Sequence, residues 1–510
     1  MTYNDDEQIN DASQVVSAGD NHHQPEAPLE ETELKVLVEL TGSGENEDRS
    51  PVDIVAVLDV SGSMDKEDRI GKLRIAMQFL IQKLSPIDRM SVVTFSTGSE
   101  RLFPLRQITN DSQMEIIEKV NGLSAGGWTN MFDGLKTGVQ VLKDRRFNRG
   151  RLGAIILMSD GDQTLSYGDA RHVQVDNFAV HTFGFGSDAK AEVLTDIANK
   201  SKGGTFAEVK DHKNLTKAFS QCLGGLLTVV VKDLDLTITQ FDQESKIENV
   251  SAGNYPKTEK DHNVTISFGE LYNSEVRMVM VYLLLPKVDR KKSRDVLQVS
   301  YKYSSGKGKP FEAPPVTATV TRSGKARVKV IPKLILEESR LMALNSVKEA
   351  RVLADNSELE RAKNIVDEAK HMLEGVMVDD DPTELIKTLI YDLQQLSEFM
   401  KTQKDYEEKG RPYALSFETS HDRQRYAARG DVDKVRSFAT PRMNAYLEQA
   451  KKFDNDPNTP PPSVGTDQII EDANKPPPPP KTVTPYYIEI VRQVLNFIGS
   501  VLKWIAGRRT

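Results

Sequence analysis

The sequence of 510 residues contains a single cysteine, Cys222. One thiol cannot form an internal disulfide, and it is too few for a zinc site built from several cysteines. This scarcity favours a reducing compartment, because disulfide frameworks are typical of secreted domains. We expect Cys222 to be packed in an apolar helix, where it behaves as a small hydrophobic side chain.

The chain also shows neither a secretory signal nor a long apolar run. Residues 1–31 have no basic n-region and no apolar h-region, so the sequence predicts no signal peptide. No segment reaches the roughly 18 consecutive apolar residues that indicate a membrane-spanning helix. We therefore expect a cytoplasmic protein, with peripheral contact to a membrane surface as an open alternative.

Several classes of function are disfavoured by what is missing. The formal net charge is −8, which excludes a nucleic-acid binder by overall composition. Neither a phosphate-binding G-x-x-x-x-G-K-[ST] loop nor an H-E-x-x-H zinc motif occurs in the sequence. His172 and His181 have no catalytic partner pattern, and His181 lies in a predicted strand, where we expect a structural role. The sequence therefore predicts a protein that is not an enzyme.

Strand and helix patterns alternate over residues 52–224. Fully apolar strands such as residues 153–159 alternate with amphipathic helices such as residues 69–84. This alternation is typical of a mostly parallel, doubly wound α/β sheet with helices on both faces. The strand over residues 101–108 follows another strand with no helix between them, so we expect it to be an antiparallel edge.

A β-rich segment follows the α/β unit. Over residues 225–330, short β runs separated by turn residues predict an antiparallel β-sandwich of roughly seven strands. An alternating strand over residues 33–41 is expected to belong to this β domain, which would leave the α/β unit inserted within it. Residues 1–32 carry many acidic groups and no lysine or arginine, which predicts a disordered acidic tail.

The C-terminal part is helical and then rich in proline. Residues 333–405 predict a helical hairpin or small bundle, with a coiled-coil dimer as the alternative. Residues 406–453 are expected to be mixed and partly helical, and residues 454–485 to be a proline-rich linker. Residues 486–507 predict an amphipathic helix, for which a membrane surface, a partner groove and the protein's own body are open alternatives. Its narrow polar face consists of Arg492, Asn496, Ser500 and Lys503.

Oxygen-bearing side chains follow two apolar strands of the α/β unit. Asp59, Ser61 and Ser63 follow the strand in "VDIVAVLDVSGSMD", and Asp160 ends the strand "GAIILMSD". Thr129, in "AGGWTN", precedes the helix that leads into that second strand. Ligands of open parallel sheets bind beyond the carboxyl ends of the strands, so these groups are expected to converge there. An all-oxygen set suits a hard divalent cation, Mg²⁺ above Mn²⁺ or Ca²⁺. Helix capping is the structural alternative for the serine-rich loop alone.

The segments "DVSGSM", "GGWTN" and "MSDGD" in this order resemble a von Willebrand factor type A (vWA) domain. The resemblance implies a metal-ion-dependent adhesion site (MIDAS), in which Ser61, Ser63 and Thr129 are ligands. It also implies that Asp59 and Asp160 act directly or through water. The order of segments is similar to plant intracellular vWA proteins, some of which carry a RING finger and act as ubiquitin ligases. One cysteine cannot build a RING finger.

The predicted site indicates a binding function. Hydroxyl ligands bring no charge, so the cation keeps a coordination position that an outside carboxylate can fill. We expect a non-enzymatic module that binds an exposed Asp or Glu of a partner protein. One alternative is a membrane-associated scaffold or adaptor that contacts a membrane surface through residues 486–510, or that acts in ubiquitin-ligase assemblies. Another is a Mg²⁺-dependent phosphoryl-transfer enzyme with Asp59 as nucleophile, which is disfavoured because Ser61 stands where such enzymes use a second Asp.

Overall fold

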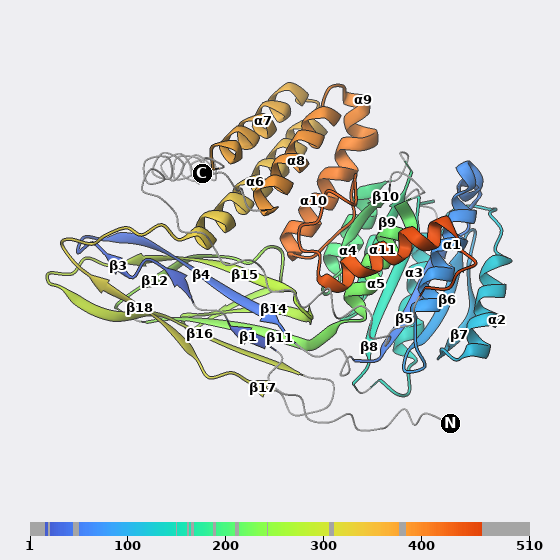
Figure 1. The fold of residues 1–510 in the computed structure, drawn as a ribbon, viewed down its shortest axis with the longest axis horizontal. Helices are drawn as coiled ribbons and strands as arrows, with labels where there is room; N and C mark the ends of the chain where they lie inside the picture. Colours follow the sequence, from blue (N-terminus) through green and yellow to red (C-terminus); the bar gives the residue numbers. More distant parts are fainter. Residues whose placement is uncertain are drawn as a thin grey trace.

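The structure is a computed structural model with an α/β domain, a β-sandwich and a helical region (Figure 1). In Figure 1 the α/β domain and the β-sandwich lie side by side, and the helical region lies above them. The structure describes residues 16–18, 21–43, 50–148, 150–160, 163–164, 168–186, 190–209, 214–241, 243–304, 311–376 and 384–461.

The α/β domain is built on a six-stranded sheet with the order β10-β9-β8-β5-β6-β7. Five strands run parallel, and β7 pairs antiparallel with β6 at one edge. β5 lies at the centre and is buried along its whole length because both of its faces are covered. The strands are β5 (Val52–Asp59), β6 (Arg89–Phe95), β7 (Ser99–Gln107), β8 (Leu152–Ser159), β9 (Ala179–Phe185) and β10 (Phe206–Val209).

Helices cover both faces of this sheet, which confirms the predicted doubly wound fold. Alternate residues of β5 point to opposite sides: Ile54 and Leu58 pack with α1, α2 and α5, whereas Val55 and Val57 pack with α3 and α4. The helices are α1 (Arg69–Lys83), α2 (Asn110–Asn121), α3 (Met131–Lys143), α4 (Ala191–Lys200) and α5 (Leu215–Leu226).

The β-sandwich consists of a five-stranded and a seven-stranded sheet. It therefore has more strands than the roughly seven expected, because several are short edge strands without a clear apolar alternation. The five-stranded sheet contains β1 (Val16–Ala18), β2 (His22–His23), β4 (Thr32–Gly42), β12 (Lys246–Ser251) and β15 (Val276–Leu285). The other contains β3 (Glu26–Ala27), β11 (Val229–Gln240), β13 (Lys257–Lys260), β14 (Asn263–Tyr272), β16 (Lys292–Ser304), β17 (Phe311–Glu312) and β18 (Val316–Arg322).

The N-terminal strands place the α/β domain within the β-sandwich. β4 precedes the α/β domain in the chain and pairs with β15, which follows it. β1 pairs with β4, and the Tyr301 hydroxyl donates a hydrogen bond to the buried Val16 carbonyl at 2.9 Å. The prediction of a disordered tail over residues 1–32 is therefore wrong for residues 16–18 and 21–32. Their order depends on pairing with strands far along the chain, which local composition does not reveal.

The helical region packs against both other parts. Helices α6, α7 and α8 share one apolar core, and α10 packs against α6, α4 and β10. α11 lies along α5 and α1 of the α/β domain (Figure 1). The elements are α6 (Pro332–Asp355), α7 (Leu359–Val376), α8 (Glu384–Phe399), α9 (Gln403–Asp405), a π-helical turn (Tyr406–Gly410), α10 (Arg411–Arg423) and α11 (Pro441–Asn455).

The first two residues of the segment predicted as a proline-rich linker, 454 and 455, belong instead to α11, which continues to Asn455. Most of that predicted linker and the predicted amphipathic helix over residues 486–507 lie outside the described residues. None of the helices in the described part of the chain combines the length and the apolar character needed to cross a bilayer.

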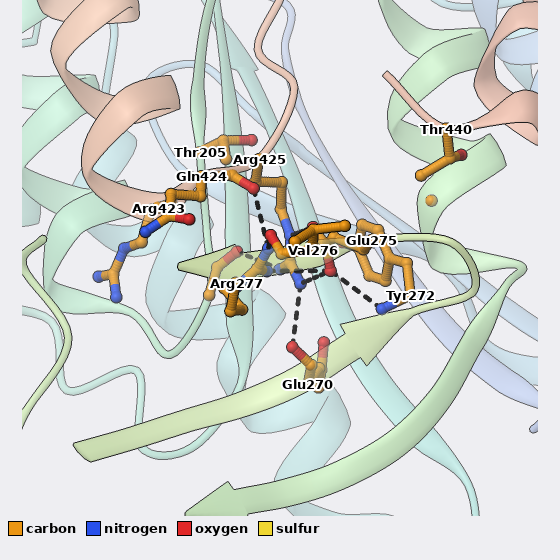
Figure 2. Close-up of polar contacts among 12 residues, drawn as sticks. Thr205, Glu270, Tyr272, Glu275, Val276, Arg277, Arg423, Gln424, Arg425 and Thr440 are labelled. Carbon is orange, nitrogen blue, oxygen red and sulfur yellow. Dashed lines mark hydrogen bonds and ion pairs between the residues drawn. The ribbon is translucent and has the colours of Figure 1, made fainter. Parts of the chain in front are cut away.

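A buried cluster of charged groups joins the three parts of the molecule. Glu275, which precedes β15, accepts hydrogen bonds from Arg425 at 2.8 and 3.0 Å and pairs with Arg277 at 2.9 Å. Arg425 also donates to the Gly203 carbonyl of the α/β domain at 2.8 Å. Figure 2 shows these arginines gathered around Glu275. The segment after α10 therefore connects the β-sandwich to the α/β domain.

Candidate metal-binding site

The carboxyl ends of β5 and β8 carry the predicted site. These strands are parallel neighbours at the centre of the sheet. The chain continues from β5 to β6 on one side and returns to β8 on the other, so the strand order reverses at this point. Open α/β sheets bind ligands at such a switch point, and Asp59 and Asp160 lie there at the ends of the two strands.

Asp59 is a fully buried carboxylate at the end of β5. Its Oδ1 accepts a hydrogen bond from the Ser61 backbone N–H at 2.8 Å, and its Oδ2 accepts one from the Ser159 hydroxyl at 2.6 Å. Burial, and next the charge of Asp160, raise the pKa of Asp59 to about 7. The charge of Asp160 is thus close enough to disfavour the ionisation of Asp59, and a cation between the two carboxylates would relieve this repulsion.

The serine loop and the threonine loop lie next to each other. The Ser61 and Ser63 hydroxyl oxygens are 3.0 Å apart. Backbone hydrogen bonds from Gly62 N–H to the Gly127 carbonyl, at 3.1 Å, and from the Gly126 N–H to the Val60 carbonyl, at 2.8 Å, tie the two loops together. These bonds bring the loop that carries Thr129 beside the end of β5.

Thr129 lies immediately before the N-cap residue of α3 and is buried. Its carbonyl accepts a hydrogen bond from the Thr164 N–H at 2.9 Å, which connects it to the segment that follows β8. Three loops from distant parts of the sequence therefore gather at one edge of the sheet and carry all five predicted site residues.

The helix-capping alternative does not account for the serines. Ser61 is the N-cap residue of the 3₁₀ helix Gly62–Asp68, but its side chain makes no capping hydrogen bond there. The N-cap position of α1 is held by Asp68, also without a side-chain capping bond. The hydroxyls of Ser61 and Ser63 contact each other instead.

Sequence reasoning missed Arg69, the first residue of α1. Its guanidinium is buried, with 4% of the side chain exposed, and its Nη1 lies 3.2 Å from Oδ2 of the buried Asp160. Arg69 Nη2 also lies 3.9 Å from the carboxylate of Glu67, which is exposed. A cationic side chain therefore stands directly beside one of the predicted ligands.

The donor set fits a hard divalent cation. Two carboxylates and three hydroxyls, without sulfur or imidazole, match the oxygen preference of Mg²⁺ and related ions. Within the described ranges no group of three or more His, Cys, Asp and Glu side chains is arranged to hold a metal. The predicted site is of another kind, because three of its five side chains carry hydroxyls and only two carry carboxylates.

The other singled-out residues have structural environments. His181 is buried in β9, its Nδ1 lies 3.1 Å from the Thr205 hydroxyl, and burial lowers its pKa to about 3. Burial raises the pKa of the partly buried Cys222 in α5 to about 12, so its thiol stays protonated near neutral pH. Neither lies in the cluster around Asp59.

A second carboxylate on β5 was also missed, at the opposite end of the strand. Asp53 is fully buried and accepts hydrogen bonds from Arg89 at 2.7 Å, and from Arg145 and Arg151 at 2.8 Å each. Burial alone would raise its pKa, but the hydrogen bond and charge of Arg89, with the other two arginines, lower it. This cluster lies at the amino ends of the parallel strands, away from the ligand edge, and is structural.

We expect Asp53→Asn to destabilise the fold by about 3–5 kcal/mol, because it leaves buried guanidiniums without their carboxylate. Because the pKa of Asp53 is lowered on folding, the contribution of Asp53 to folding stability is present near neutral pH. It is lost as the pH falls through the pKa that Asp53 has in the folded protein. Thermal unfolding of both proteins from acid to neutral pH measures this. An equal melting temperature at neutral pH would contradict the assignment.

The α/β domain has the fold of a vWA domain. Residues 53–221 match the family model described as "von Willebrand factor type A domain". The α/β domain of this chain is therefore a vWA domain. Residues 383–452 match a second model, described as "VWA / Hh protein intein-like", which covers the segment from α8 to α11.

Two solved structures share the fold. A von Willebrand factor type A protein from Catenulispora acidiphila aligns with a TM-score of 0.59 and 16% identity, over 82% of this chain and 98% of that one. The ArnB paralog VWA2 from Sulfolobus acidocaldarius aligns with a TM-score of 0.51 and 18% identity, over 80% of this chain and 98% of that one. These alignments extend well beyond the α/β domain.

A plant protein is similar in sequence. The E3 ubiquitin-protein ligase WAV3 of Arabidopsis thaliana is 28% identical over 339 residues, which cover 64% of this chain and 43% of the relative. The chain thus matches less than half the length of this plant protein.

Proposed function

We propose that this chain is a protein-interaction module that binds through a divalent cation, with Mg²⁺ as the natural ion. The observation that carries this proposal is the pair of buried carboxylates, Asp59 and Asp160, beside the adjoining hydroxyls of Ser61 and Ser63. Ser61, Ser63 and Thr129 would hold the ion, and Asp59 and Asp160 would act directly or through water.

The chemistry of the site favours an acidic ligand. The hydroxyls carry no charge. Mg²⁺ prefers about six oxygen ligands, so the two carboxylates alone do not complete its coordination. An Asp or Glu side chain of a partner protein would displace a water from the remaining position. In this proposal the module acts by binding.

The rim of the site offers an apolar contact. Trp128, next to Thr129, is 66% exposed, and its backbone N–H donates to the Thr97 hydroxyl at 3.2 Å. Gly127 has φ of +83°, and a Cβ there would lie 2.7 Å from the Thr97 hydroxyl oxygen, so the loop requires glycine. An exposed tryptophan on a loop fixed in this way resembles the aromatic anchors of protein interfaces.

We expect Trp128→Ala to weaken partner binding by at least about tenfold, because it removes an aromatic side chain that the complex would bury. The affinity for Mg²⁺ should stay unchanged, because the indole supplies no ligand. Isothermal titration with Mg²⁺ and with the captured partner measures both quantities. Met114→Ala is the matched control, because Met114 is also 66% exposed but lies on α2. Equal partner affinity for the two variants would contradict a role for Trp128.

A more specific proposal is that the chain is an adaptor in a ubiquitin-ligase assembly. It is supported by the 28% identity over 339 residues to a protein named as an E3 ubiquitin-protein ligase. The 510 residues contain one cysteine, too few for a RING finger, so the chain would present a client rather than transfer ubiquitin. A cytoplasmic location is part of this proposal.

Affinity capture from a cell extract tests the metal-bridged function. Full-length protein is used in Mg²⁺ and in EDTA, beside the Asp59→Ala and Asp53→Asn variants. We expect one set of proteins to be retained by wild type and Asp53→Asn in Mg²⁺ only, and to be lost with Asp59→Ala. If the same proteins are retained in EDTA and by the Asp59→Ala variant, the proposal is refuted. Ubiquitin-ligase subunits among the retained proteins would support the adaptor role.

A further inference from the structure

Arg69 brings a positive charge into the proposed site. Its side chain and that of Asp160 are almost completely buried, at 4% and 2% exposed, and they form an ion pair at 3.2 Å. The backbone turns sharply just before Arg69, where Glu67 and Asp68 adopt positive φ of 51° and 56°. A guanidinium held in this way is always charged, since arginine does not lose its proton in proteins.

A count of formal charges shows the consequence. Asp59 and Asp160 bring two negative charges when ionised, which alone would neutralise a divalent cation. With Arg69 included, the ion and these buried groups carry one net positive charge, and the exposed Glu67, 3.9 Å from Arg69 Nη2, offsets it only weakly because solvent screens it. Because the site is poorly solvated, this charge is costly until an anion arrives. One carboxylate from outside restores neutrality.

We propose that Arg69 is a built-in counter-ion that competes with the metal for Asp160 and makes retention of the metal depend on the partner's carboxylate. This inference rests on the proposed function and assigns its regulation. Without an acidic ligand, Arg69 neutralises Asp160 and the cation is held weakly. When an acidic side chain binds, its charge compensates Arg69, and cation and acid are held together. Metal and partner therefore bind cooperatively.

Titration of the full-length protein with Mg²⁺ tests this coupling. The titration is done in sodium acetate, which stands in for a carboxylate side chain, and in sodium chloride of equal ionic strength. We expect acetate to tighten Mg²⁺ binding to the wild type. Arg69→Gln should bind Mg²⁺ in chloride at least about tenfold more tightly than the wild type, because a nearby like charge is removed. The same variant should gain much less from acetate.

Two further variants separate charge from folding. Arg69→Lys keeps the charge and should behave like the wild type. Lys72→Gln removes a charge from the same helix, where Lys72 acts on Asp454 rather than on the site, and should also match the wild type. Melting temperatures show that each variant is folded.

Two results would overturn the inference, and they differ in meaning. If Arg69→Gln and Lys72→Gln bind Mg²⁺ as the wild type does, with the same response to acetate, Arg69 is not a counter-ion while the metal site stands. If none of the four proteins binds Mg²⁺ in either buffer, the metal site itself fails, and the proposed function fails with it.

Discussion

Replacing Asp59 with asparagine is expected to stabilise the protein in EDTA at about pH 8 and to abolish its stabilisation by Mg²⁺. In the metal-free fold, burial and the charge of Asp160 raise the pKa of Asp59 from 3.8 to about 7. The folded state thus holds a proton that the unfolded state releases between these values, so stability is lost as the pH rises through this window. Asparagine is neutral at every pH and avoids that loss.

The size of the effect follows from the shift. Each pKa unit corresponds to about 1.4 kcal/mol, so the gain from Asp59→Asn above pH 7 is on the order of 4 kcal/mol at most. Asparagine can keep the hydrogen bond that Asp59 Oδ1 accepts from the Ser61 N–H. It lacks the charge that a cation needs, so Mg²⁺ should raise the melting temperature of the wild type only.

Asp53→Asn is the matched control, because it is the same chemical change on the same strand. It should lower the melting temperature in EDTA and leave the response to Mg²⁺ intact. Thermal unfolding of the three proteins from about pH 4 to pH 8, with EDTA or Mg²⁺, gives all the comparisons. If Asp59→Asn destabilises the metal-free protein at pH 8 as Asp53→Asn does, Asp59 is a structural carboxylate and not a metal ligand.

Glu275→Gln is expected to destabilise the whole molecule by about 3–5 kcal/mol. Glu275 is the carboxylate that both Arg425 and Arg277 contact, and these arginines are 1% and 0% exposed. The Arg425 guanidinium also lies 3.8 Å from the centre of the Tyr272 ring. A neutral glutamine would leave two buried positive charges next to each other. All three parts of the molecule should loosen, because Arg425 also holds the Gly203 carbonyl.

Glu244→Gln provides the comparison for this prediction. Glu244 also pairs with two cations, Lys292 at 2.8 Å and Arg294 at 3.4 Å, but their side chains are 26% and 56% exposed. Solvent screens such pairs, so the loss should be below about 1 kcal/mol. Urea unfolding, followed by fluorescence and by proteolysis, measures both variants. Equal stability of Glu275→Gln and Glu244→Gln would contradict the view that the buried cluster holds the parts together.

The α/β domain and the grouping of the five proposed ligands at one edge of its sheet could be predicted from the sequence for a physical reason. A strand buried on both faces is apolar along its middle, so Asp59 at the carboxyl end of "VDIVAVLDV" contrasts with the apolar residues that precede it. Parallel strands place their carboxyl ends together, which brought Asp160 and Thr129 into the same prediction. These inferences needed only local pattern and a general rule of sheet topology.

Arg69 could not be predicted in the same way. It opens an amphipathic helix, where a charged residue is expected to face solvent, and its partner Asp160 is 91 residues away. The segment after α10 was missed for a related reason. "RQRYAARGD" reads as an exposed polar loop, yet Arg425 and Arg429 are 1% exposed because Glu275 and Asp392 neutralise them. A charged side chain can be buried only if an oppositely charged partner lies beside it. That partner comes from another element of the fold, and a single sequence does not show which residue it is.

A crystal of the full-length protein grown with Mn²⁺ tests the central claim most directly, because Mn²⁺ scatters anomalously and replaces Mg²⁺ at oxygen sites. The account predicts one anomalous peak between the ends of β5 and β8, within about 2.0–2.3 Å of the Ser61 and Ser63 hydroxyls. Thr129, Asp59 and Asp160 should surround it, directly or through water. No peak at this position in crystals grown with both Mn²⁺ and acetate in excess would contradict the account.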